Sequence, residues 1–111
     1  LASAFSRSSE ALRSILHDFI SSTDEHIKQL AQFREQKQWD SISRLAHKML
    51  PLFRQLEAVS IVEILQKLEH PDKANISQDD MDTLTAKVIK LIAELQNAIK
   101  NEDVLQVHTA M

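Results

Sequence analysis

Apolar residues recur along most of the chain at spacings of three and four, which is the period of an amphipathic α-helix. Five such stretches, separated by short polar segments, cover residues 10–20, 22–33, 39–56, 61–68 and 77–99. Amphipathic helices joined by short loops pack with their apolar faces together. The pattern therefore predicts an all-α fold, an antiparallel up-and-down four-helix bundle with an additional short N-terminal helix.

Residues that favour helix ends mark the first two stretches. Ser8 or Ser9 is a candidate N-cap for the first helix. Ser22 and Glu25 have the spacing of a capping box, which predicts that a second helix starts after the polar break at 21–25. A kink in one continuous helix is the alternative at this point.

Similar signals mark the last two stretches. His70 and Pro71 end the fourth, because proline cannot continue a helix, and Ser77 with Asp80 forms a capping box that opens the fifth. Residues 102–111 lack the helical period. We therefore divide the chain into a helical bundle over residues 1–101 and a poorly ordered C-terminal tail over residues 102–111.

Composition narrows the possible functions. The chain has no glycine, whereas phosphate-binding loops and dinucleotide fingerprints require it, so we expect no ATP site of its own and no bound cofactor. It has no cysteine, which fits a reducing compartment and a cytoplasmic location. The net charge is −3 without a basic block, which argues against nucleic acid as a partner. The apolar runs are too interrupted to cross a membrane, so direct membrane contact is not expected, although a parent protein can be anchored there.

The five histidines are the candidates for chemistry. No two of them lie three or four residues apart, so the chain lacks the helical spacing of a metal site. Four of them are interpreted as ordinary surface residues. These are His17, His26, His70 and His108.

His47 lies near the middle of the third stretch. At about 100° per residue it lies about 155° from the centre of the apolar stripe, which places it on the solvent face. A solvated surface histidine is the simplest interpretation of that position alone. The same outer face is predicted to carry Ser43, Leu50, Pro51 and Arg54.

The residues around His47 change this interpretation. The segment Ile42 to Ala58 reads ISRLAHKMLPLFRQLEA. It resembles the signature of histidine-containing phosphotransfer (HPt) domains, roughly Leu-Ala-His-x-Leu-Lys-Gly followed by small residues. The resemblance extends over residues 11–69, and the long final helix fits the family's bundle. Because the chain begins at Leu1 without an initiator methionine, we expect an excised module. The resemblance implies that its source is a bacterial hybrid sensor histidine kinase.

The resemblance implies a phosphoryl carrier in a multistep two-component relay. His47 would accept a phosphoryl group from an aspartate of a response-regulator receiver domain and pass it on. An unperturbed imidazole has a pKa of about 6.5, so near neutral pH it offers a lone pair for this attack. The partner would supply the aspartate and Mg²⁺, so we expect a monomeric, non-autonomous module without a metal of its own.

Three positions depart from the family pattern. The usual Lys three residues after the histidine is Leu50, the usual Gly four after is Pro51, and the usual small residue seven after is Arg54. Leu50 cannot neutralise a phosphoryl group. Arg54, about 20° from His47 on the helical projection, is the first candidate for that charge, and Arg44, about 60° away, is the second. Partner docking is assigned to Ser43, Leu50, Pro51 and Arg54.

Pro51 also predicts a disturbed helix beside His47, because it lacks the N–H that would bond to the carbonyl of residue 47. The helix either bends there or ends near Leu50 and restarts at Pro51. The departures leave other functions open. One is a degenerate docking or adaptor module that binds a receiver domain without phosphotransfer; another is a purely structural helical adaptor. The dimerisation helix of a sensor kinase fits less well, because Lys48 follows the histidine where that signature has an acidic residue.

Overall fold

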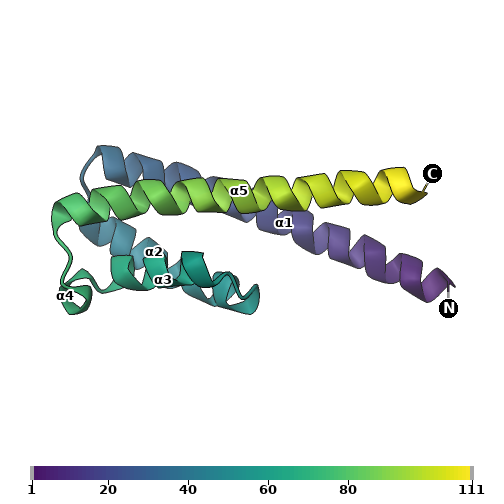
Figure 1. The fold of residues 1–111 in the computed structure, drawn as a ribbon, viewed down its shortest axis with the longest axis horizontal. Coiled ribbons are helices and arrows are strands. Elements are labelled where there is room, and N and C mark those ends of the chain that lie inside the picture. The colour runs from purple at the N-terminus through teal and green to yellow at the C-terminus, as the bar shows by residue number, and fades with distance from the viewer. Residues whose placement is uncertain (1, 111) are drawn as a thin grey trace.

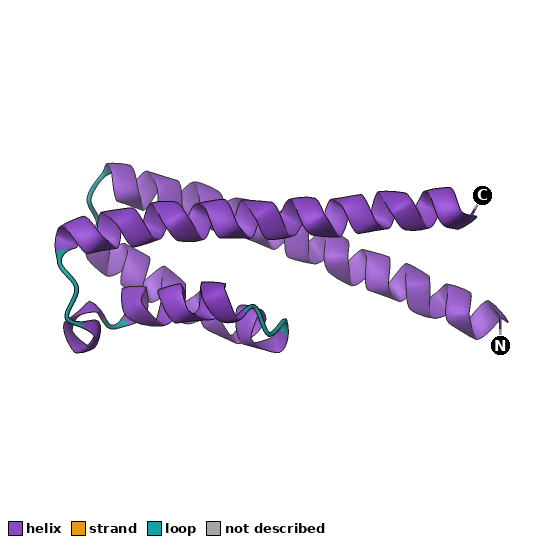
Figure 2. Ribbon diagram, viewed as in Figure 1, coloured by secondary structure: helices purple, strands orange, loops and turns teal. Residues whose placement is uncertain are grey.

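The computed structural model describes the backbone of residues 2–110 and the side chains of residue 11 and residues 13–101. This part of the chain contains helices and no strand, so the predicted all-α class is confirmed (Figure 2). The helices are α1 (Ala2–Glu35), α2 (Trp39–Gln55), α3 (Val59–Glu69), α4 (Pro71–Ala74) and α5 (Gln78–Ala110).

The four long helices pack side by side, and α4 is a single turn between α3 and α5. Contacts join α1 to α2, α2 to α3, α3 to α5 and α5 back to α1. Figure 1 shows the chain reversing direction at each connection between these four helices, with both termini at one end of the molecule. Of these four helices, α2 and α3 are the shorter ones and cover only part of the α1–α5 pair. The molecule is therefore elongated, with dimensions of 53 × 22 × 17 Å.

Helix α1 differs from its prediction, because it is continuous from Ala2 to Glu35. The predicted caps at Ser8, Ser9 and Ser22 and the separate N-terminal helix are therefore wrong. Within the polar break, Thr23 Oγ1 donates to the carbonyl of Phe19 at 2.8 Å, a bond that a hydroxyl can make inside a continuous helix. The short additional helix of the fold is α4, not an N-terminal element.

The buried face of α2 is also rotated from the predicted apolar stripe, whose last members are Leu52 and Leu56. Leu52 is only partly buried and Leu56 is 44 % exposed, because α2 packs between α1 and α3 and buries the adjacent side of the helix. Phe53 on that side makes an edge-to-face contact with Phe19 of α1, with ring centroids 5.9 Å apart. The buried residues of α2 are Ile42, Leu45, Ala46, Met49, Leu50 and Phe53.

At three helix ends, a residue other than glycine adopts the left-handed backbone conformation. Lys37, Glu57 and Asn75 have φ between 55° and 56°. After α2, for example, the N–H of Glu57 bonds to the carbonyl of Arg54, and that of Ala58 bonds to Phe53. This is the Schellman pattern, in which glycine is the favoured residue at the left-handed position.

Helix α5 begins as predicted and extends further. The N–H of Ser77 donates to Asp80 Oδ2 at 3.0 Å, and the N–H of Asp80 donates to Ser77 Oγ at 3.1 Å, so the capping box is confirmed. The helix then continues to Ala110, past the predicted start of the tail at residue 102. The side chains of residues 102–111 lie outside the described part of the chain.

Candidate functional site

His47 lies near the middle of α2 and points to solvent. Its side chain is 74 % exposed, whereas its neighbours Leu45 and Ala46 belong to the core. The exposure predicted from the helical projection is therefore confirmed. The imidazole of His47 is thus accessible on a helix whose other side is buried in the core.

A carboxylate on the next helix orients the ring of His47. Glu69, the last residue of α3, accepts a hydrogen bond from His47 Nδ1 at Oε1, with 2.8 Å between the two atoms. That hydrogen bond lowers the pKa of Glu69 against the opposing effect of burial, and the charges of His70, His47 and Arg54 lower it further. A carboxylate can only accept, so Nδ1 carries the proton, and in the neutral ring Nε2 keeps its lone pair.

The approach of Glu69 to His47 depends on a second bond between the same helices. Ser43 Oγ, one turn before His47, donates to the carbonyl of Leu68 at 2.6 Å. This bond satisfies a carbonyl in the last turn of α3, which has no helical donor of its own. Ser43 thus fixes the end of α3 against α2, which places Glu69 opposite the histidine.

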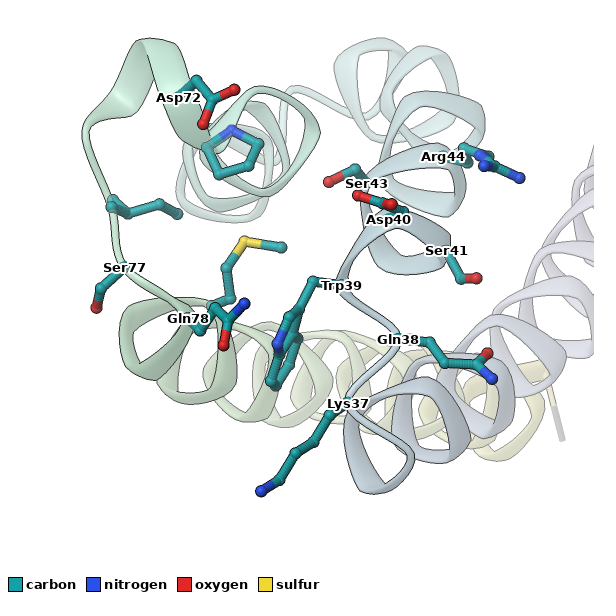
Figure 3. A pocket seen from close by; sticks show the side chains of 13 residues that line it. Lys37, Gln38, Trp39, Asp40, Ser41, Ser43, Arg44, Asp72, Ser77 and Gln78 are labelled. Atoms are coloured by element: carbon teal, nitrogen blue, oxygen red, sulfur yellow. The ribbon is translucent and has the colours of Figure 1, made fainter.

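The two candidate arginines lie in different surroundings. Arg54, exposed on α2, lowers the pKa of Glu69 through its charge and lines a shallow hollow of about 530 Å³ with Glu69 and His70. Arg44 lines a separate hollow at the start of α2, where Figure 3 shows it extending away from Asp72. Arg54 therefore shares a hollow with the carboxylate that bonds to His47, and Arg44 lines a different one.

The predicted docking residues divide into three groups. Leu50 is only 2 % exposed, so its placement on the outer face is wrong, because the buried side of α2 runs through Ala46, Leu50 and Phe53. Ser43 is half-buried and bonded to α3. Pro51 and Arg54 are exposed.

Pro51 lies inside a continuous helix. Since α2 runs from Trp39 to Gln55, the version in which one helix ends at Leu50 and another starts at Pro51 is wrong. The missing N–H of Pro51 still removes the usual helical partner of the His47 carbonyl. A bend beside His47 stays a prediction.

The other histidines are less uniform than expected. His17 and His70 are exposed, as predicted for surface residues, and the side chain of His108 lies outside the described residues. His26 is half-buried, and its Nδ1 is buried without a hydrogen-bond partner, so its interpretation as an ordinary surface residue is wrong. Burial lowers the pKa of His26, with the charge of Glu25 acting in the opposite direction.

Sequence reasoning missed Glu69. It stands 22 positions after His47, and its direction depends on how α2 and α3 pack. In the sequence, the one indication was the acidic residue at the end of the helix, just before His70 and Pro71.

Across residues 11 and 13–101, no group of three or more metal-ligating side chains converges on a common point. In the same part of the chain, no helix has the length and hydrophobicity needed to span a bilayer.

The chain was compared with known proteins. Residues 14–103 match the family model described as the Hpt domain. No curated protein and no solved structure gives a significant match.

Proposed function

The chain belongs to the Hpt domain family, whose activity is histidine phosphotransfer in phosphorelays, and from this premise we propose that His47 is its phosphorylated residue. The single observation that carries the assignment is the hydrogen bond from His47 Nδ1 to Glu69 Oε1 on an otherwise exposed imidazole. It leaves Nε2 as the nucleophilic atom and directs it away from the helix that holds the carboxylate.

The proposed donor is an aspartyl phosphate on a receiver domain. His47 Nε2 attacks the phosphorus, the bond from phosphorus to the aspartate oxygen breaks, and the aspartate leaves as a carboxylate. The ring gains positive character as the bond from phosphorus to Nε2 forms. Glu69 stabilises that charge by accepting from Nδ1, in the way that a buried aspartate supports the histidine of a hydrolase triad. Transfer onward to a second receiver is the reverse of these steps.

Charge on the transferred group needs compensation that Leu50 does not provide. We assign this to Arg54, because its charge already acts on Glu69 beside His47. Mg²⁺ in the partner's site supplies the rest. The exposed Pro51 and Arg54 lie on the docking face, and we expect a monomeric, cytoplasmic module whose parent is a hybrid histidine kinase.

The test is incubation of the chain with a phosphorylated receiver domain, followed by mapping of the labelled residue. We expect acid-labile phosphate on His47, lost in His47→Gln and retained in His17→Gln, which makes the same change at another exposed histidine. Label retained in His47→Gln would overturn the assignment. A complex that forms without any transfer would instead indicate an adaptor that only binds the receiver.

A further inference from the structure

Two histidines approach one oxygen atom of Glu69. His47 Nδ1 donates to Oε1 over 2.8 Å, and His70 Nε2 lies 3.1 Å from the same atom. The second contact is an ion pair of protonated His70 rather than a hydrogen bond. His70 is therefore placed to attract, through its charge, the carboxylate that orients His47.

The backbone holds His70 at this point. Its N–H bonds to the carbonyl of Gln66, and its own carbonyl accepts from Ala74, so the residue ends α3 and begins α4. It precedes Pro71, which excludes the helical region, and its φ of −129° and ψ of 70° agree. The side chain thus leaves the chain from a fixed position, although 56 % of it is exposed.

A second positive charge acts on Glu69. The charge of Arg54 acts on the carboxylate, and both residues line the hollow next to the site. A carboxylate drawn toward a guanidinium can rotate and lengthen its bond to His47, because Arg presents several donors. The charge of protonated His70, 3.1 Å from Oε1, opposes that rotation. The other charged residues that line the hollow are Glu63, Lys67 and Lys73.

We propose that His70 is a positioning residue for phosphoryl acceptance, and that the charge of its protonated ring holds Glu69 in the orientation that accepts the proton of His47 Nδ1. The proposal rests on the proposed function, since it concerns the same reactive imidazole. His70 does not touch the reacting atoms. It acts through Glu69, and its effect is to keep Nε2 of His47 free of a proton.

The experiment uses phosphoramidate as a small donor, so that no receiver docking is involved. The phosphorus–nitrogen bond of phosphoramidate breaks, a bond from phosphorus to His47 Nε2 forms, and the nitrogen leaves as ammonia after gaining a proton. An exposed pair makes a modest contribution, so we expect His70→Ala to slow labelling of His47 about threefold to fivefold. His70→Lys keeps a positive charge near the position of the ring and is expected to stay within about twofold of the original rate.

A second measurement separates positioning from chemistry. In ¹⁵N spectra of the imidazoles, the unmodified chain is expected to hold His47 in the Nδ1–H tautomer, and His70→Ala to give a mixture of both tautomers. Glu69→Gln is expected to disturb the same signals, whereas the control His17→Ala leaves them unchanged. These signals do not depend on phosphorylation.

The outcomes are distinct. His70→Ala that labels at the original rate with an unchanged tautomer overturns the role of His70 and leaves the proposed function intact. His70→Lys that is as slow as His70→Ala also overturns it, because the retained charge should restore the rate. If the unmodified chain takes no label on His47 from phosphoramidate or from a phosphorylated receiver domain, the proposed function fails, and the tautomer of His47 in His70→Ala alone decides whether His70 positions Glu69.

Discussion

Gln96 of α5 donates from Nε2 to Thr23 Oγ1 of α1 across 2.7 Å, inside an otherwise apolar contact. The same amide lies 2.9 Å from Asp24 Oδ1, and Thr23 in turn donates to the carbonyl of Phe19 at 2.8 Å. Each of these groups therefore has a partner within the contact. Because the partners would separate if one helix slid along the other, the pair fixes the register of α1 against α5.

Replacing Thr23 with valine tests this relationship. The variant keeps the shape of the side chain but removes the oxygen that accepts from Gln96, so we expect a loss of about 1–2 kcal/mol in the free energy of unfolding. For a domain of this size the midpoint of thermal unfolding should fall by about 5–10 °C. Circular dichroism at 222 nm measures it. Ser22→Ala, an exposed change one residue away, should leave the midpoint nearly unchanged.

The left-handed residues at the helix ends predict that glycine stabilises the fold. Glu57→Gly and Lys37→Gly should each raise the free energy of unfolding by about 0.5–1 kcal/mol, because a side chain at positive φ carries a steric cost that glycine lacks. Urea denaturation measures the change. As a control, Lys48→Gly places glycine at an exposed position in the interior of α2 and should destabilise by about 1 kcal/mol. A loss of stability in Glu57→Gly would contradict the steric argument.

Sequence periodicity predicted α2, α3 and the start of α5 close to where the structure has them. It failed at residues 21–25, because Ser and Thr favour helix caps but also fit a helix interior when the hydroxyl has a partner. The hydroxyl of Thr23 donates to the carbonyl of Phe19 and accepts from the distant side chain of Gln96. It also misplaced Leu50, since α2 packs against two helices and buries a wider arc than a single stripe.

The sequence likewise predicted only part of the candidate site. The exposure of His47 follows from the geometry of one helix, and the projection predicted it. The partnership with Glu69 depends on the crossing of α2 and α3 and on the Ser43 bond to Leu68, neither of which leaves a periodic signal. Local geometry was therefore readable from the chain, and contacts between helices were not.

Replacing Arg54 and replacing Arg44 are expected to change the rate of phosphotransfer to different extents. Arg54→Ala should slow transfer from a phosphorylated receiver about threefold to fivefold within the bound complex, because its charge acts next to His47. Arg44→Ala, which changes a residue of the other hollow, should leave that rate within about twofold. Single-turnover kinetics at saturating receiver measure both, with Lys48→Ala as a control on α2. Weaker binding without a slower step would instead assign Arg54 to docking alone.

The burial of His26 leads us to expect that the free energy of unfolding depends on pH. Burial lowers its pKa in the folded chain below 6.5, so the unfolded chain binds more protons as the pH falls through this range. The free energy of unfolding should be highest above about pH 6.5 and decline toward pH 5.5. Urea unfolding at several pH values measures the slope. His26→Gln should flatten it, and His17→Gln should not.

The pKa of Glu69 gives an effect in a different range. Its folded value lies below its ordinary one, so the stability that it contributes is lost only as the pH falls further, below about 4.5. A slope between pH 7.5 and 5.5 that survives in His26→Gln would therefore contradict the assignment to His26.

The order of helix contacts has a consequence for the folding rate. Helices α2 and α3 are adjacent in the chain and pack on each other, whereas the contact of α1 with α5 joins the two most distant helices. Loops that close over short separations form early, so the α2–α3 hairpin is expected to nucleate folding and the α1–α5 contact to form late. Thr23→Val should then mainly accelerate unfolding, while a cavity in the hairpin, such as Leu65→Ala, should slow folding. His47 and Glu69 would thus meet before the rest of the molecule has closed around them.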